Sequence, residues 1–194
     1  MDDIPLKRPP VILGSASPRR KKIMAALGIP FSVSIVETEE IHDATDPIHT
    51  VTFNAQTKYR ACRDKHPESI LITADTLVWF DGRLIGKPST FNEAADFLRA
   101  FSGHTQIVYT GVVLGWPSRE PEVRVAASSV RFKRLSETCI AHYLEKTRPF
   151  DRAGAYDIDE NGELLIESIC GSYTNVMGLP QALVRDWLCA HDVK

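Results

Sequence analysis

Two adjacent arginines stand near the start of the chain, in the segment VILGSASPRR that runs from Val11 to Arg20. A serine followed by a proline is typical of a helix start, so Arg19 and Arg20 fall in a first turn. Unpaired backbone N–H groups and the helix dipole favour an anion there, whereas cations oppose the dipole. A phosphate approaching the small residues around Ser15 would remove that conflict. The alternative is that both arginines lie on the surface with their charged ends in water.

Further acidic and basic residues recur at positions where a metal-bound polyphosphate could use them. Lys58 falls on the apolar stripe of a helix, Asp75 follows a short apolar run, and Lys87 follows a hairpin. The acidic segment ETEE ends at Glu40. Carboxylates can hold Mg²⁺ or Mn²⁺ and polarise water, while lysines and arginines neutralise phosphate charge. Each residue alone has a plain alternative, because lysines reach water, aspartates cap turns and acidic loops are solvated.

The composition is that of an ordinary globular protein and excludes several functions. The 194 residues carry 23 basic and 25 acidic side chains, a net charge of −2, so no nucleic-acid partner is expected. No apolar run approaches the roughly 18 residues of a membrane span, and the N-terminus does not read as a signal peptide. The cysteines form no CxxC pair and the histidines show no ligand spacing. P-loop, GxGxxG, HExxH and GxSxG sequences are absent. We therefore expect a cytoplasmic protein.

The apolar periodicity predicts alternating strands and helices around a mixed, twisted sheet. Strands are expected over 11–13, 31–36, 70–73 and twice within 105–132, with hairpin turns at 81–82 and between the last two. Helices are expected to begin at Ser17, Asp46, Thr90 and Ser136, with a last helix around 183–188. A polar interruption after Thr73 would place Asp75 at the end of a strand, and two short strands would accompany a turn at 161–162 in the tail. One domain over residues 1–194 is expected, with a flexible N-terminus over about 1–8.

Seven segments, in this order and at these intervals, resemble the Maf family of nucleotide pyrophosphatases, also called septum-formation-inhibitor proteins. They read GSASPRR, ETEE, AQTKYRA, ADTLVWFDGRLIGKP, FSGHTQIVYTGV, RAGAYDID and ICGSYTNVMGLP. The resemblance covers about residues 9–190. It implies an α/β Maf/inosine-triphosphatase-like fold with a central cleft between two lobes, frequently dimeric. The implied activity is hydrolysis of a nucleoside triphosphate to the monophosphate and pyrophosphate, with a divalent cation such as Mg²⁺ or Mn²⁺.

The resemblance also implies roles for individual residues. Those that would contact the substrate are Ser15, Arg19, Arg20, Glu40, Lys58 and Lys87. Asp75 would be the catalytic proton acceptor and, with Glu40, would hold the metal. Substrate choice would involve Arg20, Thr76 and Asp159.

One position departs from the family pattern. Members that prefer thymidine and uridine triphosphates carry glutamine in the segment GxYxIQ, where this chain reads GAYDID with Asp159. A glycine often stands where this chain has Asp157. Arg20 and Thr76 still favour the dTTP/UTP type, whereas aspartate would read a base edge differently from glutamine. The alternative is that Asp159 is a turn residue that does not touch the base.

The combined residues predict that water polarised by Asp75 attacks the α-phosphorus while the cations neutralise the departing pyrophosphate. A rival hypothesis is a nucleotide-sensing partner of cell-division proteins that binds the same ligand without cleaving it. The carboxylates favour catalysis, because a pure binder of polyanions gains little from them. A third hypothesis, an enzyme of the inosine-triphosphatase type, would share the architecture but not the GSASPRR and ADT pair.

Overall fold

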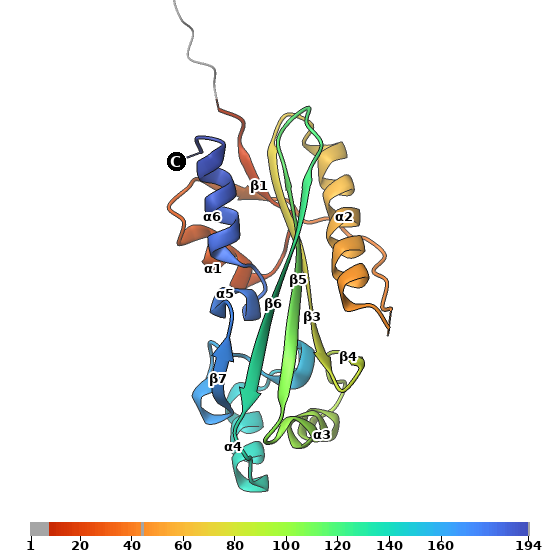
Figure 1. The fold of residues 1–194 in the computed structure, drawn as a ribbon, viewed down its shortest axis with the longest axis vertical. Helices are drawn as coiled ribbons and strands as arrows, with labels where there is room; N and C mark the ends of the chain where they lie inside the picture. Colours follow the sequence, from red (N-terminus) through yellow and green to blue (C-terminus); the bar gives the residue numbers. More distant parts are fainter. Residues whose placement is uncertain (1–7, 44, 194) are drawn as a thin grey trace, which may run out of the picture.

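The computed structural model describes residues 8–43 and 45–193, and these build a mixed seven-stranded sheet flanked by helices (Figure 1). The strands are β1 (Val11–Leu13), β2 (Phe31–Val33), β3 (Ile70–Phe80), β4 (Arg83–Ile85), β5 (Thr105–Gly115), β6 (Glu122–Phe132) and β7 (Ile166–Cys170). Their order is β2-β1-β3-β5-β6-β7, with β4 paired to β3. β1 runs parallel to β2 and β3, and the other pairs are antiparallel. The predicted mixed α/β sheet is confirmed; the predicted flexible N-terminus falls, apart from Arg8, outside the described residues.

Four of the helices begin at the capping residues that the sequence predicts. The helices are α1 (Pro18–Ala25), α2 (Pro47–Lys65), α3 (Phe91–Phe101), α4 (Glu137–Thr147), α5 (Tyr173–Val176) and α6 (Gln181–Ala190), with 3-10 turns η1 (Ala153–Ala155) and η2 (Gly162–Leu164). The side chains of Ser17, Asp46, Thr90 and Ser136 each accept the N–H of the residue three positions on. Within the described ranges, no helix has the length and apolar character needed to cross a membrane.

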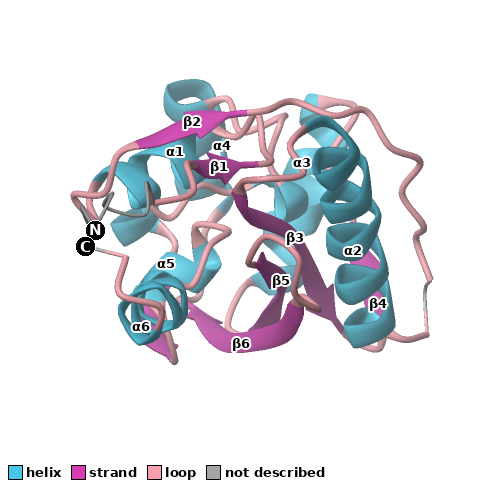
Figure 2. Ribbon diagram, turned by 90° about the horizontal axis from the view of Figure 1, so that it is seen from above, coloured by secondary structure: helices cyan, strands magenta, loops and turns pink. Residues whose placement is uncertain are grey.

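Helices cover both faces of the sheet, and alternate strand residues enter two separate cores. On one face, Leu71 and Val113 pack with Ala55, Tyr59 and Cys62 of α2, which lies along the long strands (Figures 1 and 2). On the other face, a larger core gathers the apolar sides of α1, α3, α4 and α6. The backbone of α2 approaches β5 so closely that a Cβ at Gly111 would lie 2.5 Å from the Val51 carbonyl oxygen. This close contact fixes the position of α2 relative to β3 and β5.

The polar interruption expected after Thr73 is wrong, because β3 continues through Ala74, Asp75 and Thr76. β5 pairs with every β3 residue from 71 to 79, which satisfies the backbone of this polar stretch. Asp75 therefore stands in the middle of a strand. Since side chains alternate, Thr73 and Asp75 face α2, with Thr73 Oγ1 donating to the Ala55 carbonyl at 2.8 Å. Thr76 points to the opposite face, so consecutive residues of β3 reach two different groups of side chains.

Two other boundaries differ from prediction. β2 ends at Val33 rather than near residue 36. The turn at 161–162 leads through η2 into one strand, β7, where two short strands were expected. The hairpin turn at Asp81 and Gly82 is confirmed, with φ of 51° at Asp81 and 71° at Gly82. Glycine adopts such a value without strain, and aspartate tolerates it in turns of this kind. The turn joins β3 to β4 and returns the chain toward Lys87.

Candidate active site

A cleft of about 500 Å³ gathers residues from the two ends of the chain. The predicted site residues on its wall are Ser15, Arg19, Arg20, Glu40, Lys58, Asp75, Thr76 and Lys87. A second cavity of about 470 Å³ adjoins the cleft and shares Glu40, Asp75, Thr76 and Lys87 with it. The structure therefore brings together every predicted site residue except Asp159.

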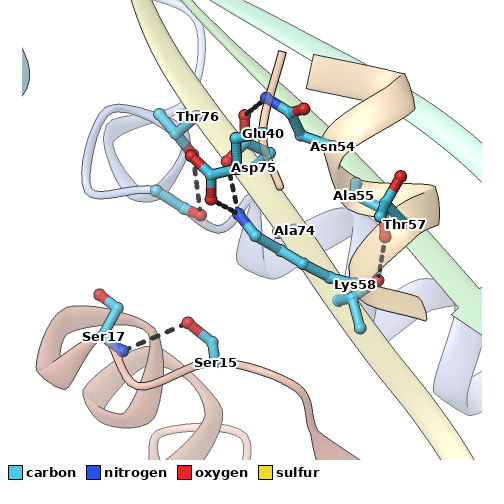
Figure 3. Close-up of polar contacts among 12 residues, drawn as sticks. Ser15, Ser17, Glu40, Asn54, Ala55, Thr57, Lys58, Ala74, Asp75 and Thr76 are labelled. Atoms are coloured by element: carbon cyan, nitrogen blue, oxygen red, sulfur yellow. Dashed lines mark hydrogen bonds and ion pairs between the residues drawn. The ribbon is translucent and has the colours of Figure 1, made fainter. Parts of the chain in front are cut away.

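On the α2 side of β3, Lys58 bridges two carboxylates (Figure 3). Its Nζ atom lies 2.7 Å from Asp75 Oδ1 and 2.7 Å from Glu40 Oε1. Asn54 lies one helical turn before Lys58 and donates from Nδ2 to Asp75 Oδ2 at 3.1 Å. We call Glu40, Asn54, Lys58 and Asp75 the carboxylate cluster. It holds both oxygens of Asp75 while leaving each a lone pair for a further donor.

The carboxylate cluster fits a divalent cation that arrives with a polyphosphate. Among residues 8–43 and 45–193, no group of three or more histidine, cysteine, aspartate or glutamate side chains could hold a metal by itself. Mg²⁺ commonly takes one or two protein carboxylates and completes its shell with phosphate oxygens and water. Glu40 and Asp75 match that donor set. The cleft has no need of a third protein ligand if the substrate supplies the remaining oxygens.

On the other side of β3, the guanidinium of Arg20 is bound by neutral oxygens of the protein. Nε donates to the Gly178 carbonyl at 2.8 Å, and the two Nη atoms donate to the Ala74 carbonyl at 2.8 Å and to Thr76 Oγ1 at 3.0 Å. A longer bond of 3.3 Å reaches Ser15 Oγ. Burial, and then the charge of Arg19, lower the pKa of Arg20, although Asp75 and Glu40 act in the opposite direction. Arg20 thus fastens the loop before α1 to β3 and to the chain after α5.

Arg19 shares a buried counter-ion with Arg152, a residue that the sequence analysis did not single out. Asp157 Oδ2 accepts from Arg152 Nε at 2.7 Å and lies 3.3 Å from Arg19 Nη1, and its side chain is only 3% exposed. Burial works to raise the pKa of Asp157. The hydrogen bonds from Arg152 and from the Asp159 N–H, with the charge of Arg19, outweigh burial and lower that pKa. We call Arg19, Arg20, Arg152 and Asp157 the arginine cluster.

The contacts of the arginine cluster correct the prediction that the first turn of α1 needs a bound anion. The predicted conflict between two arginines and the α1 dipole is relieved by the protein's own oxygens, those around Arg20 and the carboxylate of Asp157. Pro18 has no N–H, and the Arg20 N–H points at Ser17 Oγ at 3.5 Å, so the first turn offers few free backbone donors. Side chains therefore dominate any anion site at this end of the cleft.

Lys87 and Ser15 complete the polar wall. Across the part of the chain that the structure describes, the Lys87 ammonium has no ion-pair partner, which leaves its charge available to a ligand. Ser15 Oγ accepts the Ser17 N–H at 3.2 Å and orients the loop, which lies apart from the carboxylate cluster in Figure 3. A cleft with free cationic donors on one side and carboxylates on the other can bind a polyphosphate and activate water beside it.

Asp159 lies off the cleft wall. Its Oδ2 atom pairs with Lys22 on the outer side of α1, and its Oδ1 accepts from the Tyr173 hydroxyl at 3.2 Å. Its neighbour Ile158 lines the cleft instead. The base-reading role of Asp159 stays a prediction, and the alternative of a residue that does not touch the ligand agrees with this placement.

The sequence contains weak signals for the two residues that were missed. Asn54 stands four positions before Lys58 on the same helical face, which is an unusual place for a polar residue unless it has a partner. Arg152 opens the segment RAGAYDID, but nothing in its spacing links it to α1. Its contact with Arg19 passes through Asp157, 138 residues further along the chain from Arg19.

The fold and this cleft define a class of α/β protein in which cationic side chains and two paired carboxylates line one cleft. The family model described as Maf-like protein matches residues 10–191, and the chain belongs to this family, which confirms the resemblance.

Proteins named dTTP/UTP pyrophosphatase are similar over most of their length. One from Akkermansia muciniphila is 42% identical over 92% of this chain and 93% of its own. One from Deinococcus radiodurans is 41% identical over 91% of this chain and 90% of its own. One from Thermotoga petrophila is 36% identical over 92% of this chain and 87% of its own.

Proposed function

We propose that the protein hydrolyses a nucleoside triphosphate between its α- and β-phosphates and releases the nucleoside monophosphate and pyrophosphate. The observation that carries this proposal is that Lys58 bridges Glu40 and Asp75 in the same cleft whose wall also carries cationic side chains from distant segments of the chain. The relatives named dTTP/UTP pyrophosphatase support the same class of reaction. They also support a pyrimidine triphosphate, dTTP or UTP, as the substrate.

The cationic side chains would hold the triphosphate. Lys87 and the free donors of Arg19 and Arg152 would contact phosphate oxygens, with Ser15 at the loop before α1 and Lys58 beside the carboxylates. Arg20 would act mainly by holding that loop in place, because protein oxygens already surround its guanidinium. Glu40, the more exposed carboxylate, would adjust to the bound ligand.

Asp75 would act as the proton acceptor for the attacking water. A bond forms between the water oxygen and the α-phosphorus, and the bond from that phosphorus to the bridging oxygen breaks. The electron pair leaves with pyrophosphate, and the proton goes to the Asp75 carboxylate. Mg²⁺ or Mn²⁺, held by Glu40 and Asp75 together with the substrate, would supply additional positive charge against the phosphates.

Thr76 and Arg20 would contribute to substrate choice. Thr76 Oγ1 is bonded to Arg20 Nη2, to Thr110 Oγ1 and to the Gly178 carbonyl, so its position in the cleft is fixed. A fixed polar group is what discrimination between bases requires. The base-reading role of Asp159, a single domain over residues 1–194, a homodimer and a cytoplasmic location stay predictions that rest on the sequence.

Product analysis tests the proposal. The purified protein is incubated with Mg²⁺ or Mn²⁺ and a panel of canonical and modified nucleoside triphosphates, and the products are separated by ion-exchange chromatography. We expect equal amounts of monophosphate and pyrophosphate from dTTP, UTP or a modified pyrimidine nucleotide. Binding of triphosphates without any cleavage would contradict the proposal and favour a nucleotide-sensing protein.

A further inference from the structure

The side chain of Asn54 is buried in the carboxylate cluster and has all its hydrogen-bonding groups engaged. The residue is 1% exposed. Its Oδ1 accepts the Ile41 N–H at 2.9 Å, and its Nδ2 donates to the Ile41 carbonyl at 3.1 Å and to Asp75 Oδ2 at 3.1 Å. A buried amide is costly unless it is bonded in this way. The placement therefore indicates that the Asn54 amide orients its hydrogen-bond partners and does more than fill space in the core.

The backbone of Ile41 fixes the orientation of the amide. Because the Ile41 N–H needs an acceptor, Oδ1 must face it, and the two N–H groups of Nδ2 must then face the Ile41 carbonyl and Asp75. Asn54 thus presents a donor to Asp75, which suits an ionised carboxylate. A rotated amide would lose the bonds to Ile41 and place an oxygen against the carboxylate oxygen.

Asn54 joins the two carboxylates of the site by a route that does not depend on Lys58. Ile41 directly follows Glu40, so the pair of bonds to its backbone holds the acidic loop against α2. The third bond holds Asp75 on β3. Lys58 joins the same carboxylates through its charge, yet a bound triphosphate would compete for that ammonium. Asn54 has no free donor left for a ligand, so its bonds would persist when the substrate is bound.

We propose that Asn54 is a positioning residue that fixes the Asp75 carboxylate and the loop carrying Glu40 in the arrangement that hydrolysis needs. This inference rests on the proposed function. Asn54 does not touch the substrate in this account, and it acts through Asp75. Substitution of Asn54 is therefore expected to slow the chemical step, which lowers kcat, rather than to weaken substrate binding.

The test compares Asn54→Leu with the wild-type protein in steady-state assays of pyrophosphate release from dTTP and UTP. Leucine keeps the branching at Cγ and removes all three hydrogen bonds. We expect kcat to fall about 10- to 100-fold, the usual effect of a lost hydrogen bond to a charged group, while KM changes less than about threefold. Thr73→Val is the matched control, because it removes a buried bond in the same α2–β3 contact without touching Asp75. That control should lower the melting temperature but leave kcat within about twofold.

Two further variants separate positioning from general loosening of the fold. Asn54→Asp keeps the shape and the acceptor for the Ile41 N–H, but it removes the Nδ2 donor to Asp75 and to the Ile41 carbonyl and places a second anion beside Asp75. It should therefore also lose kcat, even if Asn54→Leu fails to fold. In the Asp75→Asn background, Asn54→Leu should cause little additional loss of kcat, because both changes act through one group. A folded Asn54→Leu or Asn54→Asp protein with wild-type kcat would overturn the proposal. A wild-type protein that releases no pyrophosphate would instead overturn the proposed function.

Discussion

The two sides of the cleft have opposite charge arrangements around the same strand. The carboxylate cluster places two anions around one cation, Lys58, whereas the arginine cluster pairs two cations, Arg19 and Arg152, with one anion, Asp157, beside Arg20. Asp75 and Thr76, consecutive residues of β3, serve the two clusters because side chains alternate along a strand. β3 therefore supplies the Asp75 carboxylate to one side of the sheet and the Thr76 hydroxyl, which binds Arg20, to the other.

The two clusters also differ in how far their counter-ions are sealed from water. The Asp157 side chain is 3% exposed, whereas that of Glu40 is 39% exposed. The arginine cluster is thus a preformed element that contributes to folding, and the Glu40 end of the carboxylate cluster is free to respond to a ligand. This contrast predicts that changes in the carboxylate cluster mainly cost rate, whereas changes in the arginine cluster mainly cost affinity and stability.

The largest expected effect is that of Asp75→Asn. The variant keeps its shape and its contact with Lys58 but cannot accept a proton or bind a cation as a carboxylate. We expect kcat to fall at least 100-fold, on the order of 3 kcal/mol, while the variant still folds with the secondary structure of the wild type. Pyrophosphate release and circular dichroism measure the two quantities. Asp96→Asn on the exposed face of α3 is the control, and equal kcat in both variants would remove Asp75 from the mechanism.

The next effect is on stability and depends on pH. The pKa of Asp157 in the folded protein lies below its ordinary value of 3.8, so its stabilising contribution is present above that value. The contribution is lost as the pH falls through the folded-state pKa. We expect Asp157→Asn to lower the free energy of unfolding by about 1–3 kcal/mol at pH 7, and the difference from wild type to shrink below about pH 4. Urea denaturation at several pH values measures it, and a difference that does not change with pH would contradict this account.

A smaller effect is expected for Arg152→Ala, which removes one cation from the cleft wall. Loss of a guanidinium that contacts a phosphate should raise KM about tenfold, which corresponds to about 1.4 kcal/mol, with a smaller change in kcat. Initial rates over a range of dTTP and UTP concentrations separate the two constants. Lys21→Ala, on α1 but away from the cleft wall, should leave KM unchanged. A kcat defect without a KM defect in Arg152→Ala would place this residue in the chemistry instead.

The smallest effect is expected for Asp159→Asn. Because its carboxylate lies off the cleft wall and pairs with a largely exposed lysine, we expect the ratio of kcat/KM for dTTP and UTP to change less than about threefold. The same ratio is measured for Asp159→Gln, which introduces the residue expected from the family pattern, and is compared with that of the wild type. A larger shift in either variant would support the base-reading role that the sequence predicts.

Local chemistry made much of the fold predictable from the sequence. The caps at Ser17, Asp46 and Thr90 and the turn at Asp81 act within a few residues, so their signals lie within a short stretch of chain. The continuity of β3 could not be predicted in this way. It depends on pairing with β5, which is distant in sequence and satisfies the backbone of a polar stretch.

The same distinction separates the predicted from the missed site residues. Charged residues such as Lys58 and Asp75 stand out in the sequence, because their types alone suggest phosphate and metal chemistry. Asn54 and Arg152 acquire their importance from partners that the fold brings near: Asp75 lies 21 positions from Asn54, and Arg152 meets Arg19 through Asp157, which is 138 positions from Arg19. The sequence gives no distance between such residues, so their contacts became visible only in three dimensions.

The most direct test of the central claim is the fate of the oxygen atom from the attacking water. Hydrolysis of dTTP or UTP is carried out in H₂¹⁸O, and the monophosphate and pyrophosphate are analysed by mass spectrometry. Attack on the α-phosphorus beside Asp75 predicts one ¹⁸O atom in the monophosphate and none in pyrophosphate. Label in pyrophosphate, or release of orthophosphate in place of pyrophosphate, would contradict the account.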